Sequence, residues 1–148
     1  MSIWFTNYTV DDLNTGRGLR SDHINNHLGI EFTEIGEDYV KATMPVDGRT
    51  VQPFGLLHGG ASCVLAETLG SVAAWMCIDP EKYRGVGLNI TADHLRPVFD
   101  GLVTGICKPV KLGRKTHLWR IEIFNDTGKM NCVSNLSVMI VPVEEIHR

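Results

Sequence analysis

The stretch HGGASCVLAETLGSVAAWMC, residues 58–77, decides the fold, because it holds the strongest helical pattern in the chain. Apolar side chains recur every three or four positions, and most of the opposite face is also apolar or small. A helix that is apolar nearly all round is typical of a protein interior. We therefore predict a buried helix over residues 60–77.

Strand-like segments lie on both sides of this helix. Residues 29–35 and 39–44 precede it, and four segments follow it, at residues 86–97, 102–112, 115–124 and 129–141. The short turns between these segments favour antiparallel neighbours. A single apolar helix needs a sheet wrapped around it to hide its surface. The expected fold class is therefore α+β, with a curled antiparallel sheet of about six strands around one long central helix.

The length fits one domain, residues 1–148, in which residues 1–28 form an N-terminal helix and loop extension. Thr9 is a candidate cap for a short helix in this extension. Residues 22–27 are polar and are interpreted as a loop. Residues 47–60 are rich in Gly and Pro and lack periodicity, which predicts a long loop of the kind that often carries function.

Composition and charge exclude several classes of protein. The net charge is −3 with both signs scattered along the chain, so a nucleic-acid partner is not expected. Glu67 interrupts the longest apolar run, and residues 1–10 lack the order of a signal peptide, which favours a cytoplasmic protein without a membrane span. The four cysteines form no CxxC pair, so we expect buried free thiols and no metal site; they are Cys63, Cys77, Cys107 and Cys132.

Glu67 is the first candidate for chemistry. It lies in the middle of the predicted buried helix, in a stretch otherwise free of charge. Burying an unpaired carboxylate is costly, so a carboxylate at this position favours a catalytic role. Pairing with an arginine or with hydroxyl groups is the structural alternative.

The loop QPFGLLHGG, residues 52–60, leads directly into that helix. The first backbone N–H groups of a helix have no partner inside it, and Gly59 and Gly60 leave room for a substrate to approach them. This arrangement suits an oxyanion hole, and a plain Gly-rich turn explains it equally well. Gln52 can donate its side-chain amide to a substrate carbonyl, and His58 can donate a hydrogen bond or cap the helix.

The spacing of Gly59 and Glu67 predicts a dimer. They are eight residues apart, which separates them by about 12 Å along one helix, whereas a base or nucleophile must come within about 3 Å of its target. Glu67 of one chain can instead act on a carbonyl held by Gly59 of a second copy whose helix runs antiparallel. Ser71, one turn after Glu67, either orients this carboxylate or bonds back to the helix.

These segments resemble the hotdog-fold thioesterases of the PaaI-like group. The resembling stretches are residues 41–47, QPFGLLHGGASCVLAET at 52–68, ITADHLRP at 90–97 and CKPVKLGRKTHLWRIEIF at 107–124. The resemblance extends over nearly the whole chain after residue 29 and is closest to the 1,4-dihydroxy-2-naphthoyl-CoA thioesterases of menaquinone biosynthesis. Residues 16–22 depart from the pattern of that group.

The resemblance implies an acyl-CoA thioesterase with active sites between subunits of a homo-oligomer, either a dimer or a dimer of dimers such as a homotetramer. Glu67 takes the place of the catalytic carboxylate, as general base or nucleophile, and Gly59 that of the oxyanion amide, with Gln52, His58 and Ser71 in the same site. The residues in the places of substrate and CoA contacts are Gly87, His94, Leu95, Arg96, Pro97, Lys111, Leu112, Gly113, Arg114, Lys115 and Thr116. No cofactor is implied, since coenzyme A is part of the substrate.

Two other functions are compatible with the same fold. A hotdog hydratase or dehydratase also pairs a His with an acidic residue, although Gln52 and the His58-Gly59-Gly60 start favour the hydrolase. A non-catalytic acyl-CoA-binding protein would hold the same ligand without turnover. The turn containing Lys111, Arg114 and Lys115 gathers positive charge that suits phosphate groups, and a solvated basic turn is the alternative.

Overall fold

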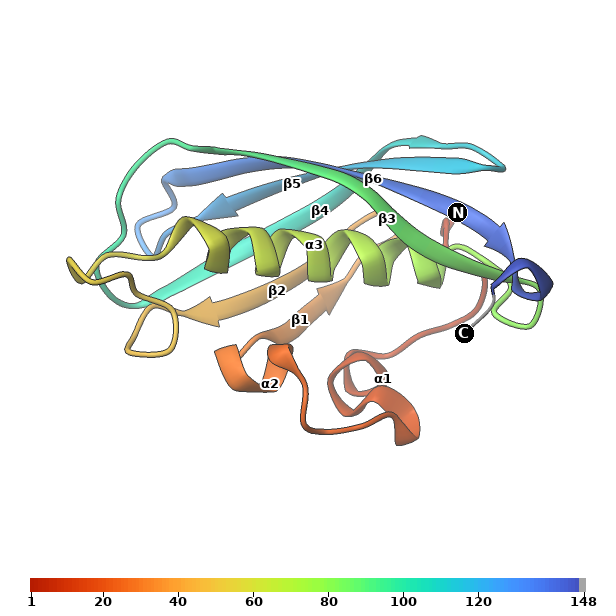
Figure 1. The fold of residues 1–148 in the computed structure, drawn as a ribbon, viewed down its shortest axis with the longest axis horizontal. Coiled ribbons are helices and arrows are strands. Elements are labelled where there is room, and N and C mark those ends of the chain that lie inside the picture. Colours follow the sequence, from red (N-terminus) through yellow and green to blue (C-terminus); the bar gives the residue numbers. More distant parts are fainter. Residues whose placement is uncertain (147–148) are drawn as a thin grey trace.

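The long helix α3 (Gly59–Met76) lies inside the curl of an antiparallel sheet of six strands (Figure 1). The structure is a computed structural model that describes residues 1–146, so the last two residues of the expected domain lie outside the described part. The strands are β1 (Glu31–Ile35), β2 (Val40–Pro45), β3 (Tyr83–His94), β4 (Leu102–Leu112), β5 (Thr116–Phe124) and β6 (Met130–Pro142). Their order in the sheet is β1-β2-β4-β5-β6-β3, and each pair is antiparallel. The expected fold class is confirmed.

The core lies between α3 and the inner face of the sheet, and glycines let the two approach closely. Gly105 of β4 is so near the helix that a Cβ there would lie 2.5 Å from Cδ1 of the fully buried Leu69. In the opposite direction, a Cβ on Gly70 of α3 would lie 2.5 Å from Cδ2 of Leu136 in β6. The helix begins and ends one residue earlier than predicted.

The expectation that α3 is buried on all sides is wrong for the single chain. The outer side of the helix carries Glu67 and Trp75, which are both exposed. The sheet curls around only one side of α3 and ends at the edge strand β3, so this chain leaves much of the other side uncovered. Within residues 1–146, no helix combines the length and the apolar character needed to cross a membrane.

The N-terminal extension contains two short helices, α1 (Val10–Thr15) and α2 (Ile24–Leu28), and a 3-10 turn lies between them at Gly16–Gly18. A second 3-10 turn, Val143–Glu145, follows β6. Thr9 caps α1 as predicted, because its Oγ1 accepts a hydrogen bond from the Asp12 N–H at 3.1 Å.

The interpretation of residues 22–27 as a loop is wrong, because α2 occupies most of them. A helix of five residues is too short to show a helical period, and Gly29, whose φ of 71° is left-handed, caps α2 after Leu28. Oγ1 of Thr68 in α3 donates a hydrogen bond to Oδ1 of Asn25 at 2.9 Å. The contact that holds α2 in place is therefore tertiary, and local sequence does not reveal it.

Strand β3 forms one edge of the sheet and is exposed along most of its length. Val86 and Leu88 are 45% and 51% exposed. One side of β3 pairs with β6, and the other pairs with no strand among residues 1–146. The strand begins and ends three residues earlier than the predicted segment 86–97. A long, apolar free edge of this kind is a template for pairing with another chain.

All four cysteines carry free thiols. Cys107 and Cys132 are buried as predicted, whereas Cys63 and Cys77 are only half-buried. The prediction of burial is wrong for these two because Cys63 lies on the outer side of α3 and Cys77 follows its last turn.

We expect Gly105→Val to lower the free energy of unfolding by about 1–3 kcal/mol, because the added atoms would overpack the contact with Leu69. Urea unfolding measures the effect. Gly48→Val is the matched control, since a Cβ at Gly48 meets nothing within 4 Å. The control variant should stay within about 0.5 kcal/mol of the parent protein. Equal unfolding free energies for the two variants would contradict the close packing of helix and sheet.

Candidate functional site

The loop between β2 and α3 is held in a defined shape by its own hydrogen bonds. The N–H of His58 donates to the carbonyl of Thr50 at 2.8 Å, and the N–H of Gln52 donates to the carbonyl of Leu56 at 2.8 Å. Oε1 of Gln52 accepts a hydrogen bond from the N–H of Phe54. The side-chain NH2 group of Gln52 therefore remains able to donate to another molecule.

The first turn of α3 leaves one backbone donor free. Nδ1 of His58 accepts a hydrogen bond from the N–H of Gly60 at 2.8 Å, so the His58 side chain caps the helix. The N–H groups of Ala61 and Ser62 both donate to the carbonyl of His58. The N–H of Gly59 has no hydrogen-bond partner among residues 1–146. Gly59 therefore supplies the amide that is available to hold an oxyanion.

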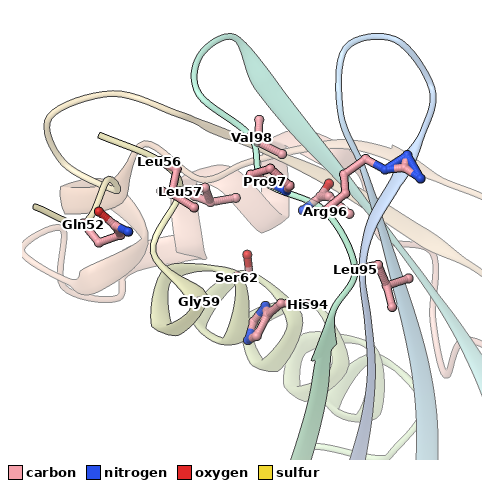
Figure 2. A pocket seen from close by; sticks show the side chains of 11 residues that line it. Gln52, Leu56, Leu57, Gly59, Ser62, His94, Leu95, Arg96, Pro97 and Val98 are labelled. Carbon is pink, nitrogen blue, oxygen red and sulfur yellow. The ribbon is translucent and has the colours of Figure 1, made fainter. Parts of the chain in front are cut away.

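A cavity of about 420 Å³ lies at this end of the molecule (Figure 2). Its lining includes six residues predicted from the sequence, namely Gln52, Gly59, His94, Leu95, Arg96 and Pro97. Gly59 lies directly against His94, because a Cβ on Gly59 would be 2.9 Å from Nε2 of that imidazole. The lack of a side chain at Gly59 thus lets the end of β3 approach the start of the helix.

Two polar residues in the cavity lining were not predicted. Ser62 is only 2% exposed, and its side chain points from α3 toward the segment that follows β3 (Figure 2). Its position three residues after Gly59, on the next turn of the helix, is a signal that sequence reasoning could have used. Asn131 of β6 is 3% exposed, and no spacing in the sequence connects it to the other lining residues.

Glu67 does not line this cavity in its own chain. Its carboxylate lies on the outer side of α3 against β3, where a Cβ on Gly87 would be 2.9 Å from Oε1. Gly87 therefore lies beside Glu67 and apart from the other predicted CoA contacts. In the described part of the chain, no arginine or hydroxyl group pairs with Glu67, and Ser71 makes no side-chain hydrogen bond. The expected burial of Glu67 is wrong for the single chain, and neither predicted role of Ser71 is seen there.

Gly59, Cys63 and Glu67 lie on successive turns of α3, which is a single uninterrupted helix. Gly59 and Glu67 are therefore about 12 Å apart along its axis. The pKa of the Cys63 thiol is raised by burial and also by the negative charge of Glu67. The N–H of Gly59 and the carboxylate of Glu67 in one chain thus lie too far apart to act on the same carbonyl.

The remaining predicted CoA contacts lie at the opposite end of the molecule. Arg114 and Lys115 in the turn between β4 and β5, and Thr116 at the start of β5, line a second cavity of about 570 Å³, together with Tyr83 at the start of β3. Figure 1 shows this turn far from the start of α3. Lys111, Leu112 and Gly113 line neither of the two cavities. Within one chain, the structure therefore separates the residues 94–97 from the residues 111–116.

Potential metal ligands do not gather in the part of the chain that the structure describes. Across residues 1–146, no group of three or more His, Cys, Asp or Glu residues is placed so that it could hold a metal ion.

Known proteins share both the sequence and the shape of this chain. Residues 54–132 match the model of the thioesterase superfamily. The chain is 48% identical over 139 residues to the 1,4-dihydroxy-2-naphthoyl-CoA hydrolase of Escherichia coli strain K12, covering 94% of this chain and 99% of that protein. It is 46% identical over 140 residues to the proofreading thioesterase EntH of Cronobacter turicensis, covering 94% and 98%.

The crystal structure of a thioesterase from Haemophilus influenzae matches this structure with a TM-score of 0.92 at 44% sequence identity, covering 99% of each chain. The family model alone covers more than half of the chain. The resemblance predicted from the sequence is therefore confirmed, and the protein belongs to the thioesterase superfamily.

Proposed function

We propose that the protein hydrolyses acyl-CoA thioesters to a free acid and coenzyme A, with aryl-CoA esters such as 1,4-dihydroxy-2-naphthoyl-CoA as the expected substrates. The observation that carries the proposal is the unpartnered N–H of Gly59 in a cavity wall, on the same helix as the unpaired carboxylate of Glu67. The names of the relatives support this substrate class, since one is a 1,4-dihydroxy-2-naphthoyl-CoA hydrolase and another a proofreading thioesterase.

A second copy of the chain supplies the carboxylate that each cavity lacks. Antiparallel pairing of β3 with its own copy would satisfy the free edge of the sheet and cover its exposed apolar side chains. Two-fold symmetry then sets the two α3 helices antiparallel, so that Glu67 of each copy approaches Gly59 of the other. A dimer of such dimers, a cytoplasmic homotetramer, is the larger assembly that the family resemblance favours.

The proposed reaction uses protein groups alone, with no metal or other cofactor. The thioester carbonyl oxygen accepts a hydrogen bond from the N–H of Gly59 and a second one from the side-chain amide of Gln52. Glu67 of the second copy takes a proton from water as the water oxygen attacks the carbonyl carbon. It then returns that proton to the sulfur as the C–S bond breaks. In the alternative that uses the same residues, the carboxylate oxygen attacks the carbonyl carbon and the C–S bond breaks, which releases coenzyme A as its thiolate. Water then opens the mixed anhydride to the free acid and the Glu67 carboxylate, and the proton that this step releases neutralises the thiolate.

The proposed dimer also reunites the two separated groups of CoA contacts. Antiparallel pairing of β3 with its copy places the start of one strand, Tyr83, near the end of the other, His94. The cavity lined by Arg114 and Lys115 of one copy then adjoins the segment after His94 of the other. These two cations suit the phosphate groups of coenzyme A.

We expect Glu67→Gln to lower kcat for benzoyl-CoA by about 10²-fold or more, because the amide can neither accept the proton nor attack the carbonyl. The fold should be unchanged, since Glu67 is exposed and unpaired in the single chain. Release of free coenzyme A measures the rate. Glu31→Gln, an exposed carboxylate on β1 at the far edge of the sheet, is the matched control and should retain full activity. Similar rates for the two variants would remove Glu67 from the mechanism.

Mixing two inactive variants tests whether the site is shared between copies. Gly59→Val would drive a side chain into His94 and block the cavity, and Glu67→Ala removes the carboxylate. In a mixed dimer both changes fall in one site and the other site is intact, so random mixing should restore about a quarter of the activity of the unchanged protein. Mixing Glu67→Ala with Glu67→Gln is the control and should restore none. The absence of recovery in well-folded mixed dimers would show that each site uses one chain only.

A further inference from the structure

Asn131 lies in a β-bulge that turns its side chain into the molecule. In the pairing of β5 with β6, Phe124 is opposite Met130 and Ile123 is opposite Cys132, so Asn131 has no partner residue. Successive side chains of a regular strand point to opposite faces, yet Asn131 and Cys132 are both buried, at 3% and 0% exposure. Bulges re-aim side chains in this way and are frequent beside active sites.

The side chain of Asn131 is an unsatisfied polar group in the wall of the catalytic cavity. It lines the same cavity as Gly59 and Ser62. Its Oδ1 has no hydrogen-bond partner among the residues that the structure describes. A buried carbonyl oxygen without a donor destabilises the fold, so a group that serves only the fold would have been better replaced by an apolar side chain.

The backbone of Asn131 is tied to the segment that we assign to coenzyme A. Its carbonyl accepts a hydrogen bond from the N–H of Leu95 at 2.8 Å. The proposed oxyanion amide of Gly59, the segment 94–98 and Asn131 therefore line one cavity, and Asn131 is hydrogen-bonded to that segment through Leu95. A ligand that occupies this cavity therefore shares it with the side chain of Asn131.

We propose that Asn131 is a further substrate-binding residue, whose side-chain carbonyl accepts a hydrogen bond from the amide N–H nearest the sulfur in the pantetheine arm of the substrate. This inference rests on the proposed function. Every CoA thioester carries that amide one ethylene unit away from the sulfur, on the side opposite the acyl group. With the thioester carbonyl at Gly59 and the arm leaving along residues 94–98, the amide donor meets an acceptor that lacks a partner.

The experiment compares two unreactive ligands, S-phenacyl-CoA and its analogue in which an ester oxygen replaces that amide N–H. Replacing the amide N–H by an ester oxygen removes one hydrogen-bond donor and changes the size of the ligand very little. For the unchanged protein we expect the dissociation constant, measured by calorimetry, to rise about three- to tenfold with the ester analogue. Asn131→Leu should bind both ligands with equal affinity. Asn135→Leu, the same change at a half-buried position of the same strand, should discriminate like the unchanged protein.

Thermal unfolding separates this role from a structural one. Because Asn131→Leu removes an unsatisfied buried group, its Tm should equal or exceed that of the unchanged protein. A clear fall in Tm, or a variant that still prefers the amide ligand, would overturn the proposal. So would a loss of affinity that appears only when the phenacyl ring carries a hydroxyl group, since the acceptor would then serve the acyl part.

The role of Asn131 in binding and the proposed hydrolase activity are tested by separate measurements, so either one can be wrong without the other. Hydrolysis of benzoyl-CoA by the unchanged protein tests the proposed function, whereas the two unreactive ligands test Asn131 without any chemical step. If the protein binds S-phenacyl-CoA with the expected amide preference but releases no coenzyme A from benzoyl-CoA, the result supports the role of Asn131 and contradicts the proposed hydrolase activity. If the protein binds neither ligand, the result contradicts both the role of Asn131 and the proposed function.

Discussion

The close contact between α3 and the inner face of the sheet is the constraint on which the rest of the structure depends. Gly105 and Gly70 remove the atoms that would hold the two layers apart, and large side chains such as Leu69 and Leu136 fill the space. This packing fixes the position of the first turn of the helix relative to the end of β3. The cavity, with Gly59 against His94, exists because that distance is set by the core.

Local patterns in the sequence predicted most of the elements and part of the site. The period of α3 and the alternation in the strands depend on nearest neighbours along the chain, so their limits were found within a few residues. The free amide at Gly59 was predictable as well, since it follows from the geometry of any helix start preceded by a tight loop. The family resemblance then named the residues 94–97, which the structure places in the same cavity.

Features set by tertiary contacts were missed or misjudged. The exposure of Glu67 depends on how far the sheet curls around α3, and the helical period does not carry that information. The helix α2 is joined to α3 by a hydrogen bond between Asn25 and Thr68, which are 43 residues apart. The inward turn of Asn131 depends on a bulge in strand pairing, which a pattern of single residues does not encode.

The place of Cys63 on α3 has a consequence for how this protein can change over time. It lies midway between Gly59 and Glu67, so in the proposed dimer the symmetry axis passes beside it and the residue meets its own twin. A larger or charged side chain at this one position would therefore collide with itself and spread both catalytic centres at once. In that dimer, the size of the side chain at this one position would set the spacing of the two proposed active sites.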